Sequence, residues 1–131
     1  MSQPGTVLLD TTVLIDTLRN RNQRRSLLAA LVASGHTLAT STVNIAEVYS
    51  GMQPGEEPAT RTFLAGLDQI PVSAAIAVRA GLLKAAFRRQ GQTRSILDML
   101  VAATAMEIGS PVATDNQKDF QISGLSLLQL P

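Results

Sequence analysis

Residues 6–18 read TVLLDTTVLIDTL, and this stretch decides the fold. Residues 6–9 predict a short buried strand, and the apolar residues of 13–18 predict a helix directly after it. Asp10 stands at the junction, where Thr11 and Thr12 offer a cap for the helix. In parallel α/β sheets ligands bind beyond the carboxyl ends of the strands, so Asp10 is a candidate functional carboxylate. Its ordinary alternative is to cap the next helix.

The rest of the chain repeats this strand–helix alternation. We expect further helices at residues 23–34, 42–51, 59–67, 74–90 and 95–108, and further strands at 37–40, 70–72, 112–114 and 125–128. Short connections between such steps favour an α/β sandwich around a mostly parallel sheet. No repeat or linker interrupts the pattern, so we expect residues 1–131 to form a single domain.

The composition narrows the possible functions. With 45% hydrophobic and 16% charged residues the chain can bury a core, and its net charge of +1 means that any nucleic-acid contact needs a local basic patch. The absence of cysteine excludes disulfides, and a single histidine, His36, disfavours zinc sites and Ser–His–Asp catalysis. The first residues resemble neither a signal peptide nor a membrane span, so we expect a cytoplasmic protein without membrane contact.

Four acidic residues lie where predicted elements begin or end: Asp10, Glu47, Asp98 and Asp115. Carboxylates without imidazole or thiolate form a hard oxygen site, which suits Mg²⁺ or Mn²⁺ and chemistry on phosphates. Two carboxylates about 4 Å apart repel each other by roughly 4 kcal/mol at an effective dielectric near 20. A gathered cluster therefore needs protons or a divalent cation to offset the repulsion. The pattern predicts a small metal-dependent nuclease.

Each acid also has an ordinary interpretation. Asp98 follows Ser95 by three residues, which matches a capping box. Glu47 falls opposite the apolar stripe that includes Val48, which is typical of a solvated glutamate. Asp115 lies in a polar turn that uses common turn residues. The four positions together are more informative than any one of them.

The motifs around these acids carry a family resemblance. They are VLLDTTVLIDTLR at residues 7–19, STVNIAEVYSGM at 41–52, RRQGQTRSILDMLVAATA at 88–105 and PVATDNQKDF at 111–120. In this order they cover essentially the whole chain, which resembles the PIN-domain nucleases, specifically the VapC-type toxins of type II toxin–antitoxin pairs. The resemblance implies a PIN-like three-layer α/β/α sandwich with a mostly parallel sheet of four or five strands and an acidic pocket at its carboxyl edge.

The resemblance also implies roles for individual residues. Asp10 and Asp98 look like the main metal ligands, and Glu47 looks like the third acid, orienting a water or a second metal. The family pattern of Thr or Ser, one residue, then Asn or Asp falls on Thr114 and Asn116. Asp115, between them, is the expected fourth catalytic acid, with Asn116 as its alternative. Thr11, Thr114 and Asn116 are expected to support the ligands by hydrogen bonds, and Asp119 is expected to be structural.

In family terms the chain is a Mg²⁺- or Mn²⁺-dependent endoribonuclease toxin that cuts a structured RNA such as tRNA or ribosomal RNA. Arg88, Arg89 and Arg94 are candidate RNA contacts, with solvated helix faces as the ordinary alternative. The resemblance further implies a homodimer and a cognate VapB-type antitoxin whose C-terminal segment lies across the pocket. Two other functions remain open: a catalytically silent RNA- or protein-binding module, and a receiver-like signalling domain. The latter needs a phospho-acceptor Asp at the end of a central strand, and neither 37–40 nor 70–72 ends in one.

Overall fold

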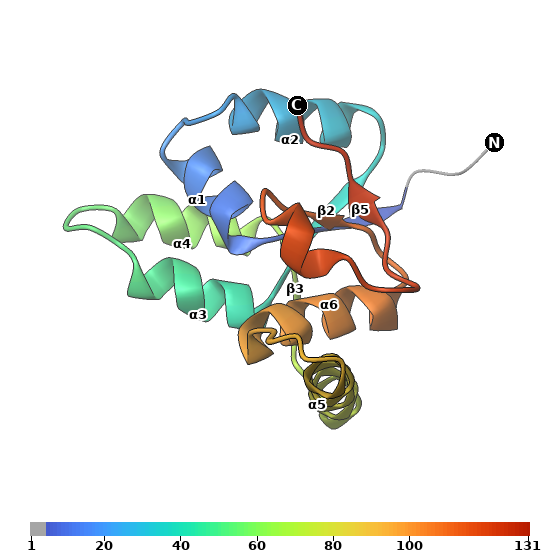
Figure 1. Cartoon of the computed structure of the whole chain (residues 1–131). Helices are drawn as coiled ribbons and strands as arrows, with labels where there is room; N and C mark the ends of the chain where they lie inside the picture. The colour runs from blue at the N-terminus through green and yellow to red at the C-terminus, as the bar shows by residue number, and fades with distance from the viewer. Residues whose placement is uncertain (1–4) are drawn as a thin grey trace.

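A five-stranded parallel sheet organises residues 5–131, which are the part of the chain that the computed structural model describes (Figure 1). Its strands are β1 (Thr6–Leu9), β2 (Thr37–Ser41), β3 (Asp68–Ile70), β4 (Val112–Ala113) and β5 (Leu127–Leu128). They lie in the order β3–β2–β1–β4–β5, and every neighbouring pair is parallel. The expected α/β fold with a mostly parallel sheet is confirmed.

Six helices connect the strands. They are α1 (Thr11–Leu18), α2 (Arg24–Ala33), α3 (Thr42–Ser50), α4 (Glu57–Ala65), α5 (Ala74–Arg89) and α6 (Ile96–Ile108), and a short 3-10 helix, η1 (Gln117–Phe120), precedes β5. Helices α1, α2 and α4 cover one face of the sheet, and α5 and α6 cover the other (Figure 1). None of the helices in residues 5–131 has the length and apolarity that a membrane crossing requires.

The alternation of side chains along β1 divides the core in two. Val7 and Leu9 belong to the cluster under α1, α2 and α4, while Leu8 belongs to the cluster under α5 and α6. All three are at most 1% exposed. Because both faces of a parallel sheet are buried, a strand here is a continuous apolar run, as the sequence of β1 is.

Helix ends follow the local sequence closely. Ser41 and Asn44 form a capping box at the start of α3, and the Ser95 side chain accepts from Leu97 and Asp98 at the start of α6. Gly109 ends α6 in the left-handed region with φ of 66°, where glycine has no steric penalty.

One local prediction was wrong. The third strand was expected at residues 70–72 and lies at Asp68–Ile70. Helix α6 packs between the sheet and α5, which buries the middle of the helix, including Met99. Leu97, in its first turn, is 42% exposed.

Candidate active site

The candidate site lies at the point where the strand order of the sheet reverses, between β1 and β4. From β1 the chain runs outward to β2 and β3 on one side, then returns to place β4 and β5 on the other side. Such a switch point leaves an opening at the carboxyl ends of the two central strands. Asp10 directly follows β1, and Thr114 directly follows β4. The two residues meet there, as predicted for strand ends at the same edge.

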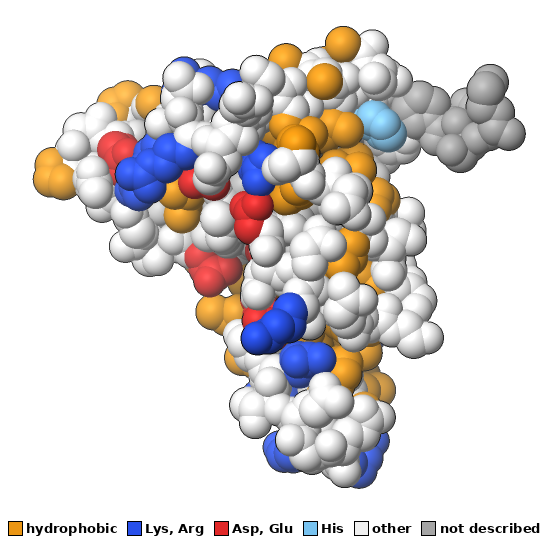
Figure 2. Space-filling view, turned by 45° about the horizontal axis from the view of Figure 1, so that its top comes forward, with side chains coloured by type: hydrophobic (Ala, Val, Ile, Leu, Met, Phe, Trp, Pro, Cys, Tyr) orange, Lys and Arg blue, Asp and Glu red, His pale blue; other side chains and the backbone are white. Residues whose placement is uncertain are grey.

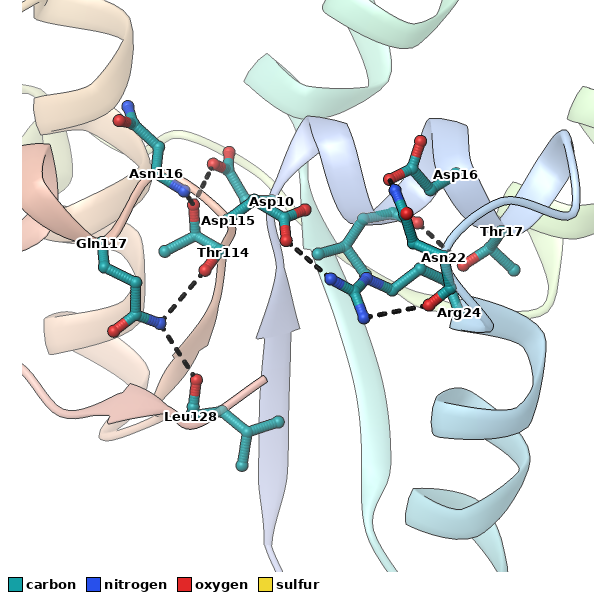
Figure 3. A network of polar contacts seen from close by, with 11 residues as sticks. Asp10, Asp16, Thr17, Asn22, Arg24, Thr114, Asp115, Asn116, Gln117 and Leu128 are labelled. Atoms are coloured by element: carbon teal, nitrogen blue, oxygen red, sulfur yellow. Dashed lines mark hydrogen bonds and ion pairs between the residues drawn. The ribbon is translucent and has the colours of Figure 1, made fainter. Parts of the chain in front are cut away.

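The Asp10 side chain accepts hydrogen bonds from other parts of the chain and does not cap its own helix. It occupies the N-cap position of α1, but its side chain makes no capping hydrogen bond. Instead, Oδ1 accepts from Asn44 Nδ2 at 3.2 Å. Oδ2 accepts from Thr114 Oγ1 at 2.8 Å (Figure 3). The residue is 7% exposed. Both donors are neutral groups, so neither supplies a positive charge to this buried carboxylate.

Glu47 joins Asp10 through a shared hydrogen-bond network. Its Oε1 accepts from Thr11 Oγ1 at 2.9 Å, and Thr11 Oγ1 accepts in turn from Asn44 Nδ2 at 3.0 Å. Glu47 is half-buried, although helical periodicity placed it on the solvent side of α3. The face opposite the apolar stripe is directed toward α1 and the site, so the solvated interpretation was wrong.

Asp98, in the first turn of α6, is half-buried and lies in the field of the other acids. Burial, followed by the charges of Asp10, Asp119 and Glu47, raises the pKa of Asp98 from 3.8 to about 6. The structure therefore brings Asp10, Glu47 and Asp98 into one electrostatic neighbourhood. Figure 2 shows acidic side chains along the hollow between the main body and the arm formed by α5.

Asp115 has a different environment. Its Oδ1 accepts from Arg24 Nη2 at 2.6 Å, so this carboxylate is directed to the start of α2 (Figure 3). The neighbouring Asn116 donates through its backbone N–H to Thr114 Oγ1 at 2.9 Å and so supports the residue that binds Asp10. Besides Asp10 and Glu47, the third acid that raises the pKa of Asp98 is Asp119, which the sequence interpretation expected to be structural.

The three arginines expected to contact RNA differ in their exposure to solvent. Arg88 and Arg89, in the last turn of α5, are exposed. Arg94 has a side chain only 14% exposed, stacks 4.4 Å from the Phe87 ring centroid and lies 3.8 Å from Asp119. Arg94 is therefore engaged within the protein, and the exposed basic charge of this region belongs to α5.

The donor set fits a hard divalent cation that keeps part of its water. Within residues 5–131 no three Asp, Glu or His side chains form a ready-made metal cage. The carboxylates are nevertheless close enough to raise the pKa of Asp98. Mg²⁺ binds through one or two carboxylates and several waters, so it does not require a closed cage. The all-oxygen donors of Asp10 and Asp98 match this chemistry.

Asn44 is the residue that the sequence interpretation missed. It is fully buried and connects Asp10, Thr11 and Ser41. Its spacing of three residues after the Ser41 cap was a usable signal for a capping box, but nothing local indicated that its amide would reach across to β1.

The acid cluster predicts a pH-dependent stability. Because the pKa of Asp98 is higher in the folded chain than its usual 3.8, the folded state binds more protons between about pH 4 and pH 6. Stability is therefore lost as the pH rises through this window. Solvent screening reduces the effect to on the order of 1 kcal/mol. In urea unfolding without metal, the stability difference between wild type and Asp98→Asn should grow from pH 4 to pH 7. An equal difference in unfolding free energy at both pH values would contradict the conclusion that burial and the neighbouring acids raise the pKa of Asp98.

Comparison with known proteins gives a consistent set of similarities. A family model described as PIN domain matches residues 7–122. Ribonuclease VapC19 of Mycobacterium tuberculosis (strain ATCC 25618 / H37Rv) is 30% identical over 113 residues, which cover 86% of this chain and 90% of VapC19. The tRNA(fMet)-specific endonuclease VapC of Shigella flexneri is 25% identical over 122 residues, covering 89% and 91% of the two chains. A solved toxin–antitoxin complex from Klebsiella pneumoniae contains a chain 30% identical, with a TM-score of 0.75 and coverage of 91% and 94%.

Proposed function

The chain belongs to the PIN-domain family and, within it, to the VapC ribonucleases, and on this basis we propose that residues 1–131 act as one domain that cleaves a structured RNA with a divalent cation. The observation that carries the proposal is the position of Asp10. It is buried at the carboxyl end of β1 between two neutral donors, in the same field as Asp98 and Glu47. A divalent cation would supply the positive charge that these two neutral donors do not.

Each residue then has a distinct role. Asp10 and Asp98 hold the cation, which is Mg²⁺ or, in its place, Mn²⁺. When bound, such a cation activates water and stabilises the charge that develops on the phosphate. Glu47 orients the attacking water with the carboxylate oxygen that Thr11 leaves free. Thr114 fixes the orientation of Asp10, and Asn116 fixes that of Thr114.

For the fourth acid we propose Asp119 in place of Asp115. Asp119 contributes to the raised pKa of Asp98, whereas the Asp115 carboxylate is engaged by Arg24 at 2.6 Å. Arg94 lies farther from its carboxylate, at 3.8 Å from Asp119, so Asp119 keeps more freedom than Asp115 to meet a cation.

The proposed substrate is a tRNA or a ribosomal RNA. The Shigella flexneri relative is a tRNA(fMet)-specific endonuclease, which supports a folded RNA as the substrate class. We expect the purified protein to cut total RNA with Mg²⁺ or Mn²⁺ and not with EDTA, and sequencing of RNA ends after brief expression should identify the target. Binding without any cleavage would instead favour the catalytically silent module.

Two exposed arginines are proposed to bind the RNA backbone. Helix α5 carries Arg79, Lys84, Arg88 and Arg89 and no acidic residue. Replacing both Arg88 and Arg89 with Glu should weaken RNA binding. The slope of log affinity against log salt concentration should become shallower by roughly one for each phosphate that the variant no longer binds. Filter binding in EDTA at several salt concentrations measures this. An unchanged slope would return these arginines to the role of solvated surface charges.

The proposed partners follow from the family. We propose a cognate VapB-type antitoxin, supported by the 30% identical chain in the Klebsiella pneumoniae toxin–antitoxin complex, and a homodimer. We also propose that the protein acts in the cytoplasm, because its proposed substrates are RNAs of translation. Co-purification with the product of a neighbouring small open reading frame would test the first of these directly.

A further inference from the structure

The loop that follows β4, residues 114–120, is bound on two sides by arginines from distant parts of the chain. Arg24, in the first turn of α2, donates to Asp115 at 2.6 Å. Arg94, between α5 and α6, has Nη1 3.8 Å from Asp119 Oδ1. The arginine side chains are only 4% and 14% exposed. Ion pairs on a protein surface usually leave both side chains in solvent, but these two arginine side chains are buried against the loop. The contacts therefore hold the loop in place.

Arg94 is fixed from several directions. Its guanidinium carbon lies 4.4 Å from the Phe87 ring centroid, and Nη2 donates to Gln92 Oε1 at 3.1 Å. Its backbone carbonyl accepts from Lys84 Nζ, and its Nε is buried without a hydrogen-bond partner. A guanidinium in this environment is not presented to a phosphate in solvent. The contacts instead orient its planar group toward Asp119.

Arg24 plays the equivalent part at the other end of the loop. Besides Asp115 it donates to the Asn22 carbonyl at 3.2 Å (Figure 3). The Arg24 side chain is only 4% exposed, and its guanidinium donates both of these hydrogen bonds. Arg24 is thus a rigid anchor rather than a mobile surface charge.

The loop between the two arginines carries two groups of the proposed site. Thr114 donates to Asp10 at 2.8 Å, and Asp119 belongs to η1, which packs against α6, the helix that carries Asp98. We propose that Arg24 and Arg94 are positioning residues that fix the 114–120 loop, and with it Thr114 and Asp119, beside the metal ligands. The inference rests on the proposed function, and it assigns Arg94 to the metal site instead of to RNA.

Arg94→Met, with Arg88→Met as the matched exposed control, separates the two roles. Calorimetry with Mn²⁺ should show affinity weakened roughly 10- to 100-fold in Arg94→Met, the range typical of residues that orient metal ligands. Its salt slope for RNA binding in EDTA should equal that of the wild type. Arg88→Met should show the reverse: unchanged Mn²⁺ affinity and a slope lower by about one. Amide hydrogen exchange should accelerate at residues 114–120 only in Arg94→Met.

Arg94→Lys and Arg24→Met cover the possibility that Arg94→Met fails to fold. Lysine keeps the charge without the planar group, so we expect a smaller loss of Mn²⁺ affinity, and Arg24→Met should also weaken Mn²⁺ binding. Wild-type Mn²⁺ affinity in all three variants would overturn the inference while leaving the proposed function intact. A lower salt slope in Arg94→Met would overturn it in favour of direct RNA binding by Arg94. A wild type that binds no Mn²⁺ would overturn both.

Discussion

Asp10→Asn and Asp98→Asn are each expected to abolish RNA cleavage while leaving the protein folded. Either change removes one charged oxygen donor from the proposed cation site. If the cation supplies roughly 4 kcal/mol of transition-state stabilisation, the rate falls about a thousandfold. Folding should persist because Asn has the size of Asp and its carbonyl can still accept one of the two hydrogen bonds that Asp10 receives. Single-turnover cleavage with Mn²⁺ measures the rate, and circular dichroism checks the fold.

Asp16→Asn is the matched control for this experiment. Asp16 is as buried as Asp10, at 7% exposure, and it lies on the same helix–strand unit. Its Oδ2 is bound by Asn22 Nδ2 at 2.9 Å, and it is not among the acids that act on Asp98. Asp16→Asn should therefore keep cleavage close to wild type. Full activity of both Asp10→Asn and Asp98→Asn with Mn²⁺ would exclude the assigned ligands.

Asn44→Ala is expected to have the largest effect on stability. The substitution removes hydrogen bonds to Asp10, Thr11 and Ser41 at a site with no solvent to replace them. The missing cap and the unpaired buried groups together cost about 2–4 kcal/mol. For a chain of this length the melting temperature should fall by about 10 °C. Differential scanning calorimetry of the metal-free protein measures this.

A second variant at the same position separates packing from charge. Asn44→Asp keeps the shape but adds a negative charge beside Asp10, so it should be destabilised without metal and regain much of its stability with Mn²⁺. Asn44→Ala should regain less, because its defect is missing hydrogen bonds. Identical responses of the two variants to Mn²⁺ would show that Asn44 has no electrostatic link to the cation.

Much of the fold and two of the acids could be predicted because the deciding features are local. The apolar run of β1 and the caps at Ser41 and Ser95 are readable over a few residues. Parallel strands that end at one edge bring their following residues together, so Asp10 was a sound expectation. Asp98 was identified by its place three residues after Ser95, and it lies half-buried in the first turn of α6.

The remaining site residues depend on contacts that local sequence does not encode. Two distant contacts distinguish Asp115 from Asp119. The η1 helix brings Asp119 toward α6, and Arg24, 91 residues before Asp115 in the chain, binds the Asp115 carboxylate. Periodicity identified the apolar stripe of α3 but not what its other face meets, so Glu47 became a candidate only through the other acids and the family resemblance. Arg94 was expected to contact RNA because nothing local indicated that it packs against Phe87 and Asp119, which come from different elements.

The central claim is that residues from β1 and α6 share one divalent cation, and anomalous diffraction from crystals soaked in Mn²⁺ tests it most directly. We expect one strong peak within bonding distance of carboxylate oxygens of both Asp10 and Asp98, about 2.0–2.2 Å from each, with Glu47 and Asp119 reached directly or through water. Fully occupied Mn²⁺ elsewhere on the molecule, with none at these two carboxylates, would contradict it.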